Sequence, residues 1–228
     1  PTCSDWMSPR SLSASASGSD AANVMRGLGA APPPTSRVEA NSCARASRAG
    51  RFSAGFGTSG ESPGMTRVDM PAVVRNNGPL IKTLALTFER FATQRKYRSA
   101  DIIGTVLSFV QTAMRYRQPD PLYQGKHTGG LLPPITAVLL GWGDCDTKTA
   151  VAASILSNWA QMRMLGIAVP GHYLMAVLQI PDQGDMFVEH QGLQYLLIEP
   201  AGPAWLPPGR VAEETVSQLN APEGNQIE

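Results

Sequence analysis

The sequence predicts an α+β fold, with helices in the first part of the folded region and an antiparallel sheet in the second. Three observations support this prediction. Residues 1–70 consist of more than half Ser, Ala, Gly and Pro, which separates them from the rest of the chain. From about Pro79 apolar residues recur at helical spacing, and beyond Pro170 they alternate as in strands. Helices followed by strands are the order of an α+β fold.

Residues 1–70 form a low-complexity extension without Ile, Tyr or Lys. Such a segment buries too little apolar surface to offset its conformational entropy, so we expect it to be disordered. Because the composition changes abruptly, we also expect translation to start near Met65 or Met70.

Two amphipathic helices are predicted between residues 79 and 116. The apolar positions that define them lie three or four residues apart: Leu80, Ile81, Leu84, Phe88, Phe91 and Ala92 in the first, and Ile102, Ile103, Val106, Leu107, Val110 and Met114 in the second. Ser99 is the predicted N-cap of the second helix, with Asp101 in its first turn. Residues 117–134, rich in Pro and Gly, are predicted to be a long surface loop.

The remaining elements follow in order along the chain. Pro at a first turn predicts a short helix over residues 134–140. A long periodic run after Gly143 predicts a helix that ends at Gly166. Residues 172–180, 186–189 and 193–199 are predicted strands of an antiparallel meander. The tail after Pro203 is expected to wrap the domain and then fray, and residues 211–228 are its polar end.

Composition excludes several functional classes. A net charge of +1, without a basic cluster carrying interleaved aromatics, argues against nucleic-acid binding. The cysteines at positions 3, 43 and 145 form neither a disulfide pattern nor a CxxC pair, and their spacing from His matches no zinc site, so no metal or other cofactor is expected. Neither a transmembrane segment nor a signal peptide is recognisable, which makes the cytoplasm the default expectation.

Cys145 is the candidate nucleophile. Asp144 is a natural N-cap, so Cys145 takes the first helical position, where the helix dipole favours a thiolate. Asp146 opposes that ionisation, and a neighbouring His is therefore needed to accept the proton. The competing interpretation is a small buried residue, the commoner fate of a single cysteine.

Three histidines could serve as the base. His127 lies in the long loop and His190 near a hairpin turn, whereas His172 opens a strand directly after Gly171. His172 is the best placed of the three, although an isolated His in this position is more often a half-buried strand residue with a satisfied hydrogen bond.

A third residue should orient the imidazole. Glu199 ends the last predicted strand on the face that carries Leu193, Tyr195 and Leu197, and Glu189 is its rival.

The run Gly143-Asp-Cys-Asp-Thr-Lys-Thr-Ala150 resembles the cysteine motif of the bacterial transglutaminase-like superfamily. The segments Ser108–Tyr116 and Pro133–Leu139 are similar to those that precede the motif in that family, and Gly171-His172 and Tyr195–Ala201 resemble its later His and acid segments. Many members carry an Asp two residues after the Cys and an Asp as the acid, where this chain has Thr147 and Glu199.

The resemblance covers about residues 79–210 and implies a papain-like fold in which the Cys helix packs on an antiparallel sheet. It implies a catalytic triad of Cys145, His172 and Glu199 that acts on peptide or carboxamide bonds of a peptide or protein substrate through a thioester. Nothing in the chain resembles the calcium-binding loops of animal cross-linking enzymes, so hydrolysis by a protease or amidase is expected rather than cross-linking. The alternative is a non-catalytic transglutaminase-like domain for binding or scaffolding. The Cys145 backbone N–H is the expected oxyanion donor, with Gln111 or Trp142 as a second.

Overall fold

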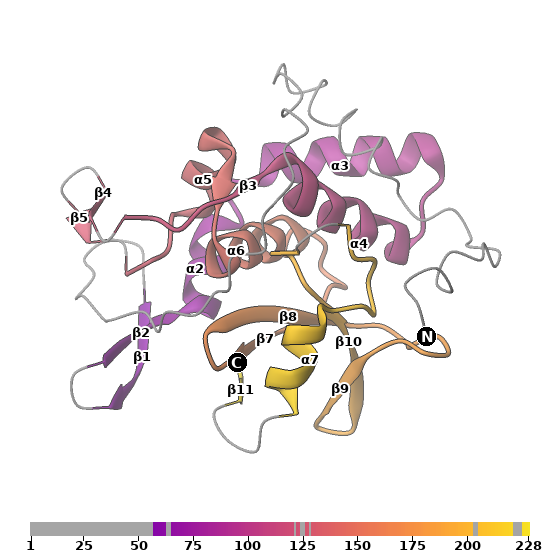
Figure 1. Cartoon of the computed structure of the whole chain (residues 1–228). Coiled ribbons are helices and arrows are strands. Elements are labelled where there is room, and N and C mark those ends of the chain that lie inside the picture. The colour runs from indigo at the N-terminus through magenta and orange to yellow at the C-terminus, as the bar shows by residue number, and fades with distance from the viewer. Residues whose placement is uncertain are drawn as a thin grey trace.

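The chain folds into a helical layer above a curled antiparallel sheet, as Figure 1 shows. This computed structural model describes residues 57–62, 65–120, 122–123, 126–127, 129–202, 205–220 and 225–228. Within those residues the chain has six α-helices, one π-helical turn and a five-stranded sheet, which confirms the predicted α+β class.

The helices come mainly from the first half of the described region. Their bounds are α2 (Met70–Asn77), α3 (Lys82–Arg95), α4 (Ser99–Ser108), η1 (Phe109–Ala113), α5 (Pro134–Leu140), α6 (Cys145–Leu156) and α7 (Glu213–Leu219). The short helix after Pro133 has the predicted bounds, because a proline in its first turn and a left-handed Gly141 at its end are both local signals. Asp101 lies in the first turn of α4 as expected, but the N-cap is Arg98, one residue before the predicted Ser99.

The five-stranded sheet is antiparallel throughout, in the order β11-β7-β8-β10-β9. Its strands are β7 (Met164–Val169), β8 (His172–Leu178), β9 (Phe187–His190), β10 (Leu193–Ile198) and β11 (Gln226–Ile227). The strand order of the predicted meander is wrong: β10 pairs with β8 as well as with β9, which leaves β9 at the edge of the sheet. Pro170 and Gly171, the latter at φ +75°, turn the chain from β7 into β8.

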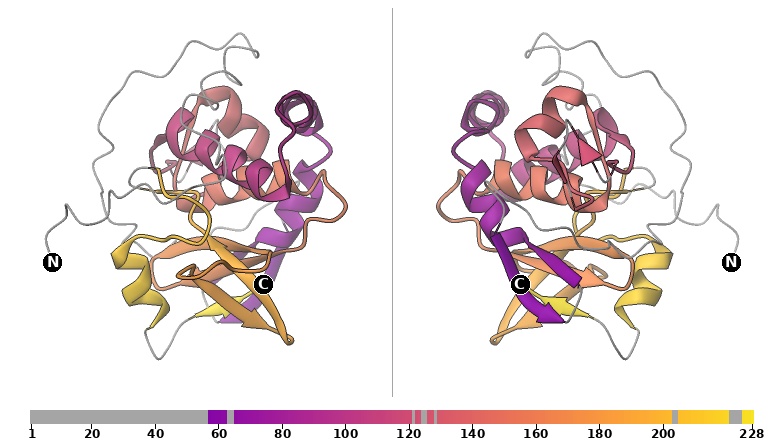
Figure 2. Two further views of the ribbon diagram at one scale, coloured as in Figure 1. Left: turned by 90° about the vertical axis from the view of Figure 1, so that its right-hand side faces the viewer. Right: turned by 90° about the vertical axis from the view of Figure 1, so that its left-hand side faces the viewer.

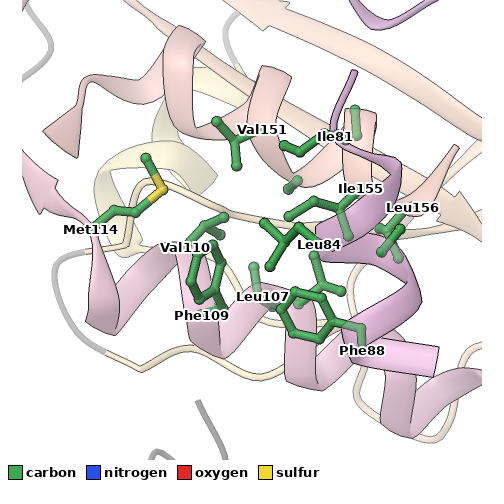
Figure 3. Close-up of a cluster of buried hydrophobic side chains, with 14 of the residues drawn as sticks. Ile81, Leu84, Phe88, Leu107, Phe109, Val110, Met114, Val151, Ile155 and Leu156 are labelled. Carbon is green, nitrogen blue, oxygen red and sulfur yellow. The ribbon is translucent and has the colours of Figure 1, made fainter. Parts of the chain in front are cut away.

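The helical layer lies against one face of the sheet and α7 lies against the other (Figures 1 and 2), with buried side chains on both faces. On one face, β8 and β10 contribute Met175, Val177 and Ile198 to the main core, which is otherwise helical. Figure 3 shows the helical part of this core, where side chains of α3, α4, η1 and α6 interdigitate. On the other face, alternate residues of the same strands pack against Val211 and Leu219 of the C-terminal segment. Side chains of β8 and β10 are therefore buried on both sides of the sheet.

Regular structure begins earlier than composition suggested. Strands β1 (Gly57–Ser62) and β2 (Met65–Asp69) pair as a hairpin inside the segment 1–70 that was expected to be disordered. Met70 is only 5% exposed and packs with Val73 and Tyr173. The predicted extension is therefore too long at its C-terminal end, whereas residues 1–56 lie outside the described residues.

The helix predicted to end at Gly166 ends ten residues earlier, at Leu156, and β7 was missed. Trp159 and Met162 keep the helical spacing, but they only pack against the core from turns. Asn158 ends the helix, because its side-chain amide donates to the carbonyl oxygens of Ser154 and Gly78 at 2.9 and 3.1 Å.

Two other segments are more ordered than expected. The loop over residues 117–134 contains the short paired strands β4 (Leu122–Tyr123) and β5 (Lys126–His127), and its end buries Leu131 and Leu132. The predicted fraying tail, 211–228, instead forms α7 and β11, and β11 pairs with β7. In the part of the chain that the structure describes, no helix combines the length and the apolar character needed to cross a bilayer.

Candidate active site

Cys145 is the first residue of α6, as the sequence predicts. The Asp144 carboxylate caps the helix by accepting a hydrogen bond from the Thr147 N–H at 3.0 Å. The Cys145 side chain is almost covered, at 6% exposure. All of α6 except Asp146 is buried, so the cysteine is held by a helix that the core surrounds on every side.

Gly143 lets the chain enter this helix. A Cβ added there would lie 2.4 Å from Cγ2 of Thr147, a distance that real side chains do not reach. Thr147 is itself fixed, since its Oγ1 accepts a hydrogen bond from the Leu132 N–H at 3.1 Å and the residue is fully buried. The glycine and the threonine of the cysteine motif are therefore matched to each other in space.

His172 and Glu199 are brought together from two neighbouring strands. His172 is the first residue of β8, and Glu199 follows the last residue of β10. Nε2 of His172 lies 2.7 Å from Oε1 of Glu199, and the two side chains are only 7% and 4% exposed. The predicted His–acid pair is present as a buried hydrogen bond.

Glu199 receives two further hydrogen bonds that the sequence analysis missed. The Ala212 N–H donates to Oε2 at 2.9 Å, and Thr215 Oγ1 donates to Oε1 at 3.0 Å. Burial alone would raise the pKa of this carboxyl, but the hydrogen bond and charge of His172, together with the Ala212 and Thr215 donors, hold the pKa below its usual value. Glu199 is therefore ionised at neutral pH.

The ionised carboxylate fixes the tautomer of His172. Because Glu199 can only accept, Nε2 carries the proton in this contact, and Nδ1 is the nitrogen through which the ring exchanges a proton elsewhere. The same contact fixes the orientation of the imidazole ring. Both effects are those required of the acid in a nucleophile–base–acid triad.

Two hydrogen bonds hold the first turns of α6 against the strand ends that carry this pair. Thr149 Oγ1 donates to the carbonyl of Tyr173, the residue after His172, at 3.3 Å. Lys148 Nζ donates to the carbonyl of Ala201, two residues after Glu199, at 3.1 Å. Cys145 precedes Lys148 by three residues, so the two share one side of the helix. The start of α6, which carries the nucleophile candidate, therefore lies at the same end of the sheet as the His–acid pair.

Lys148 is a buried cation, only 1% exposed, and the sequence analysis gave it no role. Burial lowers the pKa of its ammonium group to about 7, although the charge of Cys145 acts in the opposite direction. No local signal marks this lysine, because the helix around it is amphipathic neither in pattern nor in burial. The missed donors to Glu199 did have a signal: the acidic residues Glu213 and Glu214 in one turn are typical of a helix start.

Gln111 is not an oxyanion donor, contrary to one of the sequence predictions. Its amide nitrogen donates to the carbonyls of Glu199 and Leu206 at 2.8 and 3.1 Å, and its Oε1 accepts from the Leu206 N–H at 3.1 Å. Both amide hydrogens are thus committed. Gln111 lies in the π-helical turn η1 and ties the chain after β10 to the helical layer. The role of Trp142 remains a prediction; its ring packs under the Arg117 guanidinium at 4.6 Å.

The rival site residues lie apart from this arrangement. Glu189 is exposed on β9 opposite Gln194, and the His190 ring makes an edge contact with Tyr195 at 6.5 Å. The His127 side chain lies outside what the structure describes. Glu189 lines an open depression of about 590 Å³ at the β9–β10 hairpin, and a second depression of about 490 Å³ lies along α3. Neither touches Cys145, so we identify the site from its chemistry and not from a surface cavity.

Among the described residues no three His, Cys, Asp or Glu side chains are grouped so that they could hold a metal ion. Comparison of the chain with models of protein families, with curated proteins and with solved structures finds no match.

Proposed function

We propose that the chain is a cysteine enzyme of the transglutaminase-like type that acts on peptide or carboxamide bonds through a thioester. The observation that carries this proposal is the buried contact of His172 with Glu199, located where α6 presents Cys145. A carboxylate with three donors, a tautomer-fixed imidazole and a cysteine at a helix N-terminus are the parts that activated-thiol catalysis requires.

Each residue has a defined role in the proposed reaction. His172 Nδ1 takes the thiol proton of Cys145, and the thiolate attacks the carbonyl carbon of the substrate. When the tetrahedral intermediate collapses, the C–N bond breaks and His172 returns the proton to the leaving amine. Water then attacks the thioester while His172 accepts its proton; the C–S bond breaks, the acid leaves, and His172 returns the proton to the Cys145 sulfur. Glu199 stays ionised throughout and stabilises the imidazolium.

The carbonyl oxygen of the substrate gains negative charge in both steps and needs fixed donors. The backbone N–H of Cys145, at the first position of α6, is the donor that we propose. The helix dipole points its positive end at the same place and adds to the effect.

The arrangement of the fold supports a papain-like core for this enzyme. The nucleophile lies at the start of a central helix, and the His and the acid come from adjacent antiparallel strands that pack on that helix. The order along the chain is Cys, His and acid, as in the family that the sequence resembles. Hydrolysis is the reaction we favour over acyl transfer to an amine, since water needs no second binding site.

A reactivity measurement tests the proposal without knowledge of the substrate. In a Cys3→Ser/Cys43→Ser background, Cys145 is the single thiol of the chain. We expect iodoacetamide to alkylate native Cys145 at pH 6 faster than it alkylates the same protein unfolded in urea, where the thiol has an ordinary pKa. His172→Ala should remove this advantage. Turnover of peptide and glutamine-amide substrates should then disappear in Cys145→Ala. Native alkylation slower than unfolded alkylation, with His172→Ala unchanged, would refute the proposal.

The second candidate is a non-catalytic binding or scaffolding domain with the same core. It is favoured by one observation, the burial of Cys145, which is only 6% exposed. The alkylation experiment separates the two functions, because a structural buried thiol reacts slowly in the native state.

A further inference from the structure

The buried cation of α6 has no part in the mechanism described so far, and its position is costly. Lys148 is 1% exposed and lies one turn from the positive end of the helix dipole. Both burial and the dipole disfavour an ammonium group there, and an apolar side chain of similar length would avoid both penalties. A cation that the fold accommodates at such a cost calls for a function.

The contacts of Lys148 point to the nucleophile and the acid together. Its Nζ donates to the Ala201 carbonyl at 3.1 Å, just beyond Glu199 on the chain, and Cys145, three residues earlier on the same side of α6, raises the pKa of its ammonium group against the larger effect of burial. The other charged or titratable groups of this region are Asp144 and Asp146 at the helix start, His172 on β8 and Glu199 after β10. His172 and Glu199 satisfy each other at 2.7 Å, and the Asp144 carboxylate is committed to the Thr147 N–H.

We propose that Lys148 is a positioning residue for Cys145: fixed to the Ala201 carbonyl, its buried ammonium holds the first turn of α6 against the end of β10 and supplies positive charge beside the thiolate. This inference rests on the proposed function of Cys145. It also answers the difficulty that Asp146 opposes ionisation of the thiol, since a second, desolvated charge of opposite sign lies on the same helix. The thiolate is then stabilised by the charge of Lys148 and by the positive end of the α6 dipole, in addition to His172.

The test measures the thiol itself. In the Cys3→Ser/Cys43→Ser background, the pH dependence of iodoacetamide alkylation gives the ionisation curve of Cys145. Lys148→Met, which keeps the length without the charge, should move this curve to higher pH and slow alkylation at pH 6 about ten-fold, the effect of one pKa unit. Lys148→Arg, which keeps the charge, should stay within about three-fold of the parent protein.

A matched control separates charge from packing. Thr149→Val removes the neighbouring bond between α6 and β8, to the Tyr173 carbonyl, without a change of charge. It should lower the free energy of unfolding while leaving the alkylation curve in place. Should Lys148→Met prove unfolded by circular dichroism, the reciprocal measurement applies: Cys145→Ala should lower the pH at which the Lys148 side-chain ¹⁵N resonance titrates.

The outcomes distinguish the two proposals. Fast native alkylation that Lys148→Met leaves unchanged overturns the role of Lys148 and leaves the enzyme proposal intact. An equal slowing in Thr149→Val also overturns it, because packing would then explain both. Slow alkylation of the native parent protein counts against the enzyme proposal first.

Discussion

Nε2 of His172 lies 2.7 Å from Oε1 of Glu199, although 27 positions separate the two residues in the chain. Register brings them together: β8 and β10 pair antiparallel, with Ile198 opposite Met175, so the start of one strand lies beside the end of the other. The hydrogen bond joins the proposed base to an acid that three donors hold in its charged form.

Glu199→Gln should lower kcat far more than it lowers stability at pH 7. The amide can still accept from Nε2 or donate to it, but it carries no charge to stabilise the imidazolium. We expect a loss of at least 100-fold, on the order of what general acid–base catalysis contributes. Glu189→Gln, on the exposed edge strand β9, is the matched control and should retain full activity. Similar losses in both variants would contradict the assignment of the acid.

The same carboxyl should make stability depend on acid pH. Its pKa is lower in the folded protein than in the unfolded chain, so its stabilising contribution is complete above the unfolded pKa and is lost as the pH falls through the folded pKa. Below about pH 4.5 the free energy of unfolding, measured in urea, should therefore decrease as the pH falls. The decrease should be smaller in Glu199→Gln than in the parent protein. Parallel declines in the two proteins would mean that other carboxyl groups account for acid unfolding.

Thr215→Val should raise the pKa of Glu199, because it removes one of the donors that stabilise the charged form. The acid limb of the pH–activity profile should move to higher pH, and the free energy of unfolding should fall by about 1.5–3 kcal/mol, as expected for a hydrogen bond to a charged group. Thr215→Ser keeps the hydroxyl and should keep the acid limb in place. A stability loss without a shift of the limb would reduce Thr215 to a packing residue.

Gln111→Ala should cost stability more than catalysis. Loss of the side chain leaves the Leu206 N–H and two carbonyls without their partner, at about 1–3 kcal/mol per buried group. The fall in kcat should stay below ten-fold, whereas removal of an oxyanion donor costs about 10²–10³. Paired measurements of kcat and of urea unfolding decide between these roles. A fall in kcat of about 10²–10³ would show that Gln111 is an oxyanion donor.

Gly143→Ala should destabilise the start of α6 by about 1–3 kcal/mol, the cost of overpacking a full core. The closest clash is with Cγ2 of Thr147 at 2.4 Å, which the substitution Thr147→Ser removes while keeping the oxygen that binds Leu132; Cβ of that residue, 2.8 Å from the added methyl group, stays. The double variant should therefore recover part of the loss and be more stable than the sum of the two single losses predicts. Additive losses in urea unfolding would show that the contact with Cγ2 does not account for the cost.

Much of the fold could be predicted from local signals in the sequence. Pro134 and Gly141 mark both ends of α5, and Asp144 marks the start of α6, because each acts on its own turn of the chain. Strand β7 was missed because the helical spacing of apolar residues in α6 extends towards Gly166. The Pro170-Gly171 turn joins β7 directly to β8, and pairing with β8 along its whole length makes this segment a strand.

The residues of the candidate site also differ in how far local signals in the sequence identify them. His172 begins β8 after a glycine, and Glu199 directly follows β10 before a proline, so both could be singled out from the sequence. The helix start that carries Ala212 and Thr215 had a local signal, but their contacts with Glu199, and that of Lys148 with Ala201, join atoms that only the folded chain brings near. The prediction of Gln111 as an oxyanion donor was wrong for the same reason. Its helix was predicted, but the π-helical turn that directs its amide towards Leu206 was not.

The three donors on Glu199 also bear on how this site could diverge. An aspartate there would be shorter by one methylene, and its carboxylate would be unable to reach His172, Ala212 and Thr215 at the present distances together. The length of the acid and the residue at position 215 should therefore covary in homologous sequences: Glu with a hydroxyl donor from the C-terminal helix, and Asp where that helix is displaced or its threonine is replaced. A family tree that mixed the two freely would show that the carboxylate tolerates the loss of its C-terminal partner.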